Sequence, residues 1–309
     1  ARLREKERKE RKKEGGREGG RERGKERKRK KERVDIKETI SMKLVLFNLR
    51  EDEKSALNNW IASHPEVEVD VHSEELTASN KHLLEGKDGV VLAQNKPFEK
   101  EVYEYAKEQG IKVFATRSAG FDIYDLELMK ELDIKMTNVP SYSPNAIAEH
   151  VLTTALRISR NTNKIQRNVE KHNFTWNPGI LSRELRTLTV GVIGTGRIGT
   201  QAARLFKALG SKVLGYDIYP NDAAREVLEY VDNIDDLITN SDIITIHMPA
   251  IKDYNHMVND EFLSKMKDNS ILLNAARGML VDTKALLRAL DSGKLLGAGL
   301  DVYENEGKY

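Results

Sequence analysis

The sequence predicts an α/β protein made of two domains, each a doubly wound parallel sheet. Short apolar runs alternate with amphipathic stretches from residue 42 to residue 303, which is typical of strands joined by crossover helices. Most runs are continuous in Val, Ile and Leu, as expected for strands covered on both faces. A length of 309 residues fits two domains. We place them at residues 42–141 and 142–309, after a tail of residues 1–41.

The first domain is predicted from three apolar runs, one alternating run at Val67–Val71 and two amphipathic stretches. The strands are expected at Lys43–Leu49, Val67–Val71, Gly89–Gln94 and Lys112–Thr116, and the helices at Glu51–His64 and Lys100–Gln109.

The second domain begins with a helix whose start is marked by Ser143 and Pro144, an N-cap followed by proline at the first helical position. Its apolar positions run to about Arg160. Gly210 and Gly293 stand where left-handed helix C-caps are expected. The further strands are expected at Leu188–Ile193, Lys212–Asp217, Ile243–Pro249, Ile271–Ala276 and Leu295–Tyr303, and the helices at Gly194–Leu209 (with its loop), Glu261–Met266 and Asp282–Leu290.

Composition excludes several classes of protein. The absence of cysteine rules out disulfides, thiolate metal sites and cysteine nucleophiles, and it favours a reducing, cytoplasmic location. No run of eighteen apolar residues would cross a membrane. The sequence holds neither H-E-x-x-H nor a Walker-type loop, so we predict no metal site.

Residues 1–33 differ from the rest of the chain. They carry 18 Lys and Arg against 8 Glu, whereas the remaining residues carry 33 basic and 41 acidic side chains. With Ala1 and Leu3 as its only apolar residues, this segment cannot bury enough surface to order itself. We interpret it as a disordered tail or an artefact upstream of the folded protein. Nucleic-acid binding through phosphate neutralisation is the alternative.

A G-x-G-x-x-G motif, Gly194 to Gly199, follows the strand LTVGVI and opens the helix RIGTQAARLFKAL. Its glycines allow a tight turn, close approach to a pyrophosphate, and close packing of helix on strand. Asp217 ends the next strand, where a carboxylate accepts hydrogen bonds from a ribose 2′-hydroxyl and repels a 2′-phosphate. The motif therefore predicts a Rossmann-type domain that binds NAD.

Polar residues at the carboxyl ends of the predicted strands are candidates for chemistry, because open α/β sheets bind ligands there. Arg277 could bind a 2-oxo acid with its planar fork, or form a surface salt bridge. His247 could line the nicotinamide site or be structural. The other candidates are Asp301, Glu306 and the loop Ser118, Ala119, Gly120.

The stretches RSAGFDIYD, NVPSYSPNAIAEH, HNFTW, GVIGTGRIG, NAARGMLVDT and LDVYENE resemble the NAD-dependent D-2-hydroxyacid dehydrogenases, most closely the members acting on D-lactate. The resemblance covers residues 42–309. It implies a flavodoxin-like substrate domain, here incomplete at its C-terminal part, beside the Rossmann-type domain. It also implies a homodimer and a small 2-hydroxy or 2-oxo acid as substrate.

The resemblance also implies roles for matched residues. Arg277 orients the substrate and Glu306 pairs with the catalytic histidine. Ser118, Ala119 and Gly120 hold the substrate carboxylate, and Tyr142 faces the substrate unless it is a packed core residue. The residues expected to bind the coenzyme are Gly194, Gly196, Arg197, Ile198, Gly199, Asp217, His247, Met248, Pro249, Ala275, Ala276 and Asp301.

The sequence departs from the family at the general acid, a histidine in a P-H-x-A-F motif several tens of residues beyond the Y-E-N-E segment. All seven histidines precede Glu306, and the chain starts with Ala1 and stops at Tyr309. We therefore expect a fragment that binds NAD weakly or is unstable and turns over slowly. His150 is interpreted as a packing histidine within an apolar helix.

Two further interpretations stay open. A non-enzymatic NAD sensor resembling the C-terminal-binding corepressors would fit the basic tail and the absent histidine, although Arg277 and Glu306 argue against it. Ala93 stands where relatives often place a bulkier side chain. This predicts room for branched 2-oxo acids such as 2-oxoisocaproate as well as pyruvate.

Overall fold

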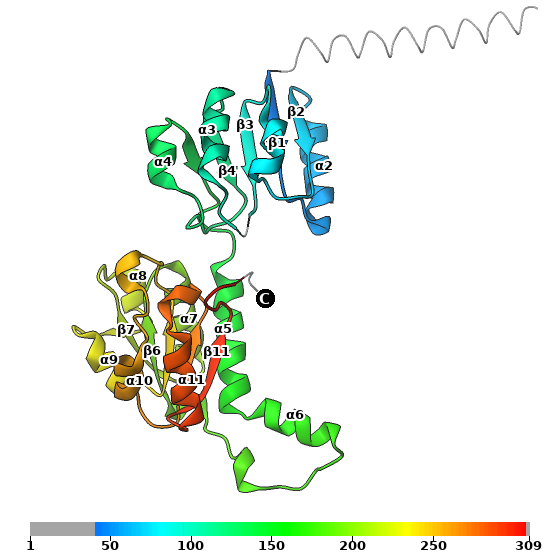
Figure 1. The fold of residues 1–309 in the computed structure, drawn as a ribbon. Coiled ribbons are helices and arrows are strands. Elements are labelled where there is room, and N and C mark those ends of the chain that lie inside the picture. Colours follow the sequence, from blue (N-terminus) through cyan, green and yellow to red (C-terminus); the bar gives the residue numbers. More distant parts are fainter. Residues whose placement is uncertain (1–40, 95, 307–309) are drawn as a thin grey trace, which may run out of the picture. The chain divides into compact units, whose positions relative to one another are not determined.

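The structure is a computed structural model that describes residues 41–94 and 96–306. The chain divides into two compact units, Ala1–Pro140 (unit 1) and Ser141–Tyr309 (unit 2), each built around a parallel sheet (Figure 1). No helix of the described residues is long and apolar enough to cross a membrane. Residues 1–40 of the predicted tail, which include its basic segment, lie outside the described residues.

Unit 1 is a five-stranded parallel sheet in the order β2-β1-β3-β4-β5. This is a flavodoxin-like order, as the family resemblance implies. The sheet is covered by helices over a core that includes Phe47, Tyr103 and Phe114. The strands are β1 (Met42–Leu46), β2 (Val67–Val71), β3 (Gly89–Leu92), β4 (Val113–Thr116) and β5 (Lys135–Thr137), and the helices are η1 (Glu51–Glu53), α2 (Lys54–Ser63), η2 (Ala78–Leu84), α3 (Lys100–Glu108) and α4 (Leu126–Glu131).

Three elements of unit 1 escaped prediction, η2, α4 and β5. All three are short, and β5 is an edge strand with a single apolar residue, Met136. The first strand is also shorter than expected. It ends at Leu46, because Asn48 adopts a left-handed φ of 54° that a strand cannot continue through.

Unit 2 is a six-stranded parallel sheet in the order β11-β10-β9-β6-β7-β8. The chain runs outward from β6 in one direction and from β9 in the other, so the topology switches between these two strands. The strands are β6 (Thr189–Ile193), β7 (Lys212–Tyr216), β8 (Glu229–Tyr230), β9 (Ile243–Ile246), β10 (Ser270–Asn274) and β11 (Leu295–Leu300), and the helices are α5 (Pro144–Ser159), α6 (Thr162–Glu170), η3 (Pro178–Ile180), η4 (Leu185–Thr187), α7 (Arg197–Ala208), α8 (Asp222–Arg225), α9 (Ile234–Asn240), η5 (Lys252–Tyr254), α10 (Asp260–Lys265), η6 (Gly278–Leu280) and α11 (Thr283–Asp291).

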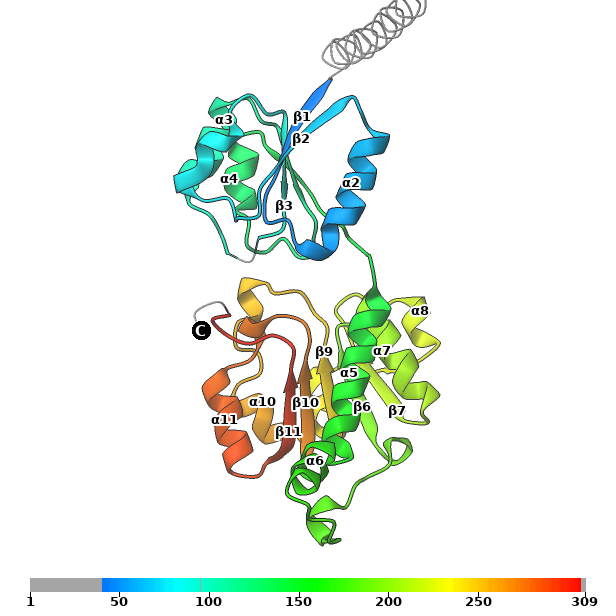
Figure 2. The same cartoon turned by 90° about the vertical axis from the view of Figure 1, so that its right-hand side faces the viewer.

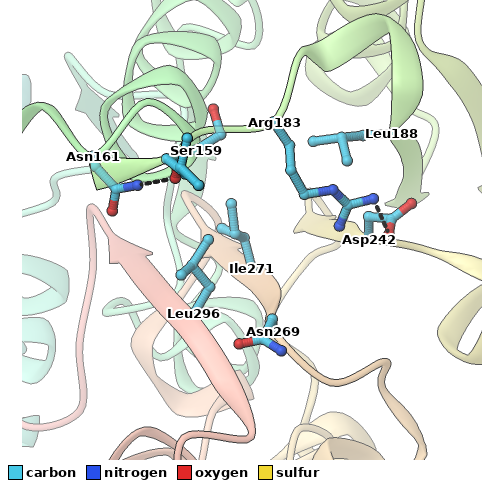
Figure 3. Close-up of a pocket in the computed structure, with 9 residues that line it drawn as sticks. Ser159, Asn161, Arg183, Leu188, Asp242, Asn269, Ile271 and Leu296 are labelled. Carbon is cyan, nitrogen blue, oxygen red and sulfur yellow. Dashed lines mark hydrogen bonds and ion pairs between the residues drawn. The ribbon is translucent and has the colours of Figure 1, made fainter. Parts of the chain in front are cut away.

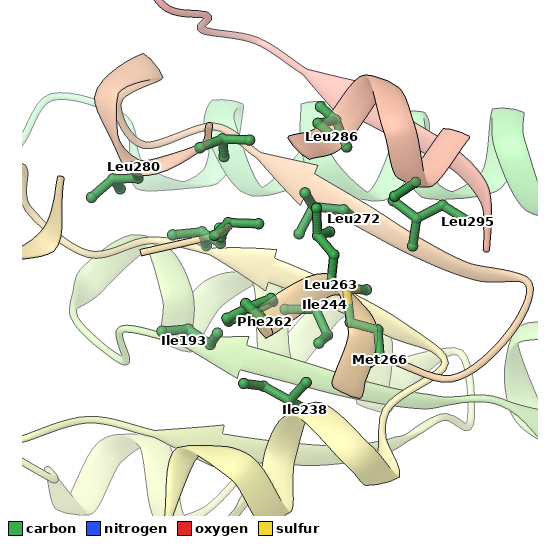
Figure 4. Close-up of a cluster of buried hydrophobic side chains, with 14 of the residues drawn as sticks. Ile193, Ile238, Ile244, Phe262, Leu263, Met266, Leu272, Leu280, Leu286 and Leu295 are labelled. Carbon is green, nitrogen blue, oxygen red and sulfur yellow. The ribbon is translucent and has the colours of Figure 1, made fainter. Parts of the chain in front are cut away.

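Apolar cores cover both faces of this sheet, as a doubly wound fold requires. One cluster joins the sheet to α9, α10 and α11 and includes Ile244, Phe262 and Leu272 (Figure 4). The other joins it to α5 and α7, which lie side by side (Figure 2). The α/β prediction is therefore confirmed.

Helix α5 begins as the sequence predicts and packs closely on the sheet. The Ser143 side chain caps it by accepting a hydrogen bond from Ala146 N at 3.3 Å, with Pro144 in the first turn. Gly299 of β11 permits the close approach, because a Cβ there would lie 2.2 Å from Thr154 Cγ2. The predicted C-caps also hold, since Gly210 and Gly293 have φ of 87° and 74°.

At the amino edge of this sheet, a hollow of about 140 Å³ separates the chain after α6 from the strand starts (Figure 3). Asp242, just before β9, closes it by accepting hydrogen bonds from Arg183 Nη2 at 3.0 Å and Thr189 N at 2.9 Å. Burial acts to raise the pKa of Asp242, but these bonds and the charge of Lys267 hold it below its usual value. The pair ties the excursion of residues 160–188 to the sheet.

Candidate active site

The glycine turn sits at the switch point of the unit 2 sheet. Gly194 has a φ of 87°, and a Cβ there would lie 2.7 Å from the backbone carbon of His247, which follows the neighbouring strand β9. A Cβ on Gly199 would lie 1.9 Å from Gly194 O. A Cβ on Gly196 would meet no atom within 4 Å. The turn is therefore tightly packed on its inner side and open where Gly196 faces outward.

A cleft of about 620 Å³ opens beside this turn at the carboxyl edge of the sheet. Its lining is largely apolar, with Asp217 as its acidic residue. The structure brings together six of the predicted coenzyme residues here, Gly194, Gly196, Asp217, His247, Met248 and Pro249. The cleft is also lined by eight residues that were not predicted as site residues, Ile193, Tyr216, Ile218, Tyr219, Ile234, Ile251, Tyr254 and Met257.

These features fit an adenine dinucleotide. The open space at Gly196 lies beside the N-terminus of α7, where backbone N–H groups without helical acceptors attract phosphate. The walls of the cleft are apolar enough for rings, and Asp217 offers a hydrogen-bond acceptor at its end.

Both oxygens of Asp217 have partners. Oδ2 accepts hydrogen bonds from Thr195 N at 2.6 Å and Thr195 Oγ1 at 3.0 Å. Oδ1 accepts one from Tyr219 N at 2.9 Å. The carboxylate is thus fixed between the glycine turn and the residues after β7, whichever ligand it meets.

His247 lies at the end of β9 in the wall of the cleft. Its Nε2 is 2.9 Å from Thr245 Oγ1, and its buried Nδ1 has no partner among the described residues. Burial lowers the pKa of His247 to about 4. The imidazole is therefore neutral at pH 7, and it lines the cleft as an uncharged polar group.

This burial predicts a pH-dependent loss of stability. The pKa of His247 in the folded state lies below the unfolded value of 6.5. The free energy of unfolding therefore has its full value above about pH 6.5 and falls as the pH drops toward 4, because the unfolded chain then binds a proton that the folded protein does not. At pH 5 we expect His247 to contribute a loss of about 2 kcal/mol relative to pH 7.5. Urea unfolding of the wild type and His247→Gln at both pH values checks this. Equal pH dependence in the two proteins would contradict it.

Arg277 follows β10 at the same edge of the sheet. It is half-buried and extended, its Nη1 donates to Ala276 O at 2.8 Å, and its carbonyl accepts Asn274 Nδ2 at 2.9 Å. A Cβ on the next residue, Gly278, would lie 2.2 Å from Tyr303 O. The backbone that leads to Glu306 therefore rests directly on the arginine turn.

A side-chain contact between Glu304 and His256 fixes the backbone that leads to Glu306. Glu304 Oε1 lies 2.5 Å from His256 Nε2, and Oε2 accepts Thr283 N at 2.8 Å. Burial acts to raise the pKa of Glu304, but these partners hold it below its usual value. Glu306 itself is exposed, with Oε1 accepting Tyr303 N at 2.9 Å.

The remaining predicted coenzyme residues lie apart from the cleft lining. Ala275 and Asp301 line a small hollow with His150, whose Nε2 is 3.5 Å from Asp301 Oδ1. Ala276 is buried, and Arg197 and Ile198 lie in the first turn of α7. The interpretation of His150 as a packed histidine is wrong, because its side chain is 53% exposed.

In unit 1, the loop after β4 turns its carbonyls inward. Ser118 O accepts Val139 N at 3.1 Å, Ala119 O accepts Asn138 Nδ2 at 2.8 Å, and Gly120 O accepts Ser118 Oγ at 2.7 Å. Among the described residues, the N–H groups of Ala119 and Gly120 donate to no protein acceptor. This leaves backbone donors available to an anion.

Tyr142 belongs to unit 2, just before α5. Its packed-core alternative is wrong, since the residue is 68% exposed. The described residues contain no group of three acidic or histidine side chains that could hold a metal ion.

Comparison with known proteins decides the family. Residues 152–308 match the family model for the NAD binding domain of D-isomer specific 2-hydroxyacid dehydrogenases. A D-lactate dehydrogenase of Treponema pallidum is 51% identical over 268 residues, which is 87% of this chain and 81% of the relative. The chain belongs to the D-isomer specific 2-hydroxyacid dehydrogenase family. The predicted family, enzyme class and coenzyme are confirmed, and this dehydrogenase is an NAD-dependent oxidoreductase.

Solved structures place the dehydrogenase in the same fold. The crystal structure of the Treponema pallidum protein superposes with a TM-score of 0.77, covering 87% of this chain and 81% of that one. A D-2-hydroxyisocaproate dehydrogenase is 37% identical with a TM-score of 0.78, covering 86% and 80%. An NAD-complexed D-isomer specific 2-hydroxyacid dehydrogenase from Lactobacillus delbrueckii ssp. bulgaricus is 35% identical with a TM-score of 0.76, covering 86% and 81%.

Proposed function

We propose that this dehydrogenase interconverts D-lactate and pyruvate with NAD. The observation that carries the proposal is the carboxyl edge of the unit 2 sheet, where a coenzyme cleft with Asp217 and the half-buried Arg277 follow strands of one sheet. Relatives at 51% and 45% identity are named D-lactate dehydrogenases.

The coenzyme residues take their roles from this geometry. The pyrophosphate binds at Gly196 and the first turn of α7, including Arg197 and Ile198, while Asp217 binds the adenosine ribose. The wall residues His247, Met248 and Pro249 contact the coenzyme in the cleft. Ala275, Ala276 and Asp301 complete the set, on the strength of the sequence motifs alone. When bound, the reduced coenzyme supplies the hydride.

The protein orients the substrate through charge and backbone donors. Arg277 binds the carboxylate and polarises the adjacent carbonyl. In the loop Ser118, Ala119, Gly120, the N–H groups of Ala119 and Gly120 donate to a carboxylate, and the exposed Tyr142 contacts the substrate. These assignments rest on the loop hydrogen bonds and on the motifs.

Proton transfer to the alkoxide requires an acid, which Glu306 keeps charged by pairing with it. One oxygen of Glu306 accepts a hydrogen bond from Tyr303 N. All seven histidines precede Glu306 in the sequence, and none occupies the matching motif.

The size of the substrate that can bind is inferred from one small residue of unit 1, Ala93. Ala93 comes directly after β3, beside the switch point between β1 and β3, and its carbonyl accepts Asn48 Nδ2 at 2.6 Å. Its side chain is only a methyl group, which leaves room for a branched 2-oxo acid.

The proposal is tested by titrating the 309-residue protein with NADH, following fluorescence transfer and calorimetric heat, and then measuring oxidation of NADH with pyruvate and with 2-oxoisocaproate. We expect saturable binding of NADH and oxidation of NADH with both acids. Absence of binding would overturn the coenzyme assignment, whereas strict preference for pyruvate would overturn only the role of Ala93.

A homodimer in the cytoplasm is part of the proposal. The excursion of residues 160–188, with α6, projects away from the unit 2 sheet (Figure 1) and exposes large apolar side chains. Phe174 is 76% exposed and Trp176 is 66% exposed. Exposed aromatics of this kind indicate a protein interface, here with a second copy. The absence of cysteine supports the location.

The dimer should dissociate when this apolar surface is removed. We expect the wild type to elute at twice 35.1 kDa and the double variant Phe174→Ser, Trp176→Ser to elute as a monomer in size-exclusion chromatography with light scattering. Trp60→Ser, an exposed tryptophan of unit 1, is the control. A wild-type monomer, or a dimeric double variant, would contradict the prediction.

A further inference from the structure

Thr195, between the first two glycines of the turn, is fully buried and has every polar atom engaged. Its N and Oγ1 contact Asp217, as described above. Its carbonyl accepts Asn221 Nδ2 at 2.7 Å and Thr200 Oγ1 at 2.8 Å. Its Oγ1 also lies 2.6 Å from the hydroxyl of Tyr230, on the edge strand β8.

The donors in this network can be ordered from chemistry alone. A carboxylate oxygen only accepts, so the single hydroxyl proton of Thr195 goes to Asp217 Oδ2. The Tyr230 hydroxyl must then donate to Thr195 Oγ1. The Tyr230 oxygen in turn accepts Asn221 N at 3.1 Å. Each donor therefore points toward Asp217, and such chains strengthen the bond at their end.

We propose that Tyr230 is a positioning residue for coenzyme choice, acting through Thr195 on Asp217. The inference rests on the proposed binding of the adenosine ribose by Asp217. Because Oδ2 is held by two bonds and Oδ1 by Tyr219 N, the carboxylate cannot rotate away from the cleft. A ribose hydroxyl finds a fixed acceptor, and a 2′-phosphate meets a fixed negative charge.

The network also explains why a residue outside the cleft lining matters. Tyr230 is not among the residues that line the cleft, and its ring is held separately by the Arg225 guanidinium, 4.9 Å from the ring centroid. Tyr230→Phe therefore removes the hydroxyl and leaves the ring contact in place. The change isolates the effect of the hydrogen-bond chain on Asp217.

The test compares dissociation constants for NADH and NADPH, measured by fluorescence and calorimetry. We expect Tyr230→Phe to weaken NADH about three- to tenfold, the usual effect of one buried hydrogen bond. NADPH binding should change less, so the preference for NADH narrows. Thr195→Val should act in the same direction, and Thr195→Ser should restore much of the preference that valine loses.

Two controls separate positioning from general loosening. Tyr105→Phe deletes a phenol hydroxyl that donates to Glu85 Oε1 at 2.8 Å in unit 1, and it should leave both dissociation constants unchanged. In an Asp217→Ala background, Tyr230→Phe should have no further effect on NADH, because its partner at the end of the chain is gone.

The outcomes are distinguishable. If the wild type does not bind NADH, the proposed function fails. If the wild type binds NADH and Tyr230→Phe keeps the full preference, or weakens both coenzymes equally, the inference about Tyr230 is overturned. An undiminished effect of Tyr230→Phe in the Asp217→Ala background would overturn it as well.

Discussion

Replacing Arg277 with glutamine should lower kcat/KM for pyruvate by about 10²-fold or more while NADH binding stays within about twofold. Each hydrogen bond to a charged partner contributes about 1.5–3 kcal/mol, and the guanidinium fork makes two of them. Arg277 lies after β10, outside the lining of the coenzyme cleft. The loss of its side chain should therefore weaken binding of the substrate and leave binding of the coenzyme unchanged.

A binding readout separates substrate orientation from the chemical step. Oxamate, an unreactive analogue of pyruvate, can be titrated into the NADH-loaded protein, and Arg277→Gln should weaken it as strongly as kcat/KM falls. Arg277→Lys tests geometry, since it keeps the charge and loses the fork. Arg288→Gln is the control, because Arg288 is an exposed residue of α11 that pairs with Asp260, the first residue of α10. If Arg277→Gln binds oxamate as tightly as the wild type does, Arg277 does not bind the substrate and its role is structural.

The sequence predicted the glycine turn and Asp217 better than it predicted the apolar residues that line the cleft. Gly194, Gly196, Gly199 and Asp217 were predicted from the fixed spacing of the motif, in which tight packing requires glycine at Gly194 and Gly199, close approach of a pyrophosphate favours glycine at Gly196, and ribose binding calls for an acid at Asp217. The structure confirms the packing that glycine permits at Gly194 and Gly199.

Residues such as Tyr254 and Met257 escaped prediction for the opposite reason. They line the cleft from the loop around η5, where no periodic pattern exists. Many side chains could form such an apolar wall, so the sequence carries no signal for it. Only the folded positions of β9 and this loop bring them together.

Tyr230 was missed because β8 is two residues long and lies at the sheet edge. A strand of that length has no alternation to detect. The same limit applies to α8 and α9, which the predicted series between Asp217 and Ile243 left out. The roles of these segments emerge from hydrogen bonds between distant residues, which local sequence patterns do not encode.

A pair of glycine substitutions should separate coenzyme binding from folding. In Gly196→Ala the new methyl group finds nothing within 4 Å, and the φ of −63° suits alanine. The protein should therefore fold with an unchanged Tm. The space that the methyl group enters is the one we assign to the pyrophosphate, so NADH should bind about 10- to 100-fold more weakly, the equivalent of a clash of about 1–3 kcal/mol.

Gly199→Ala should lose both folding stability and NADH binding. Its methyl group would lie 1.9 Å from Gly194 O, and because that atom belongs to the backbone, the turn or α7 must shift. We expect a loss of about 1–3 kcal/mol in unfolding free energy together with the loss of NADH binding. Thermal melting and NADH titration of both variants check the contrast. If Gly196→Ala binds NADH like the wild type, the coenzyme does not lie at the open side of the turn. A methyl group there would clash with a bound pyrophosphate, whereas it would have no effect on a surface that binds nothing.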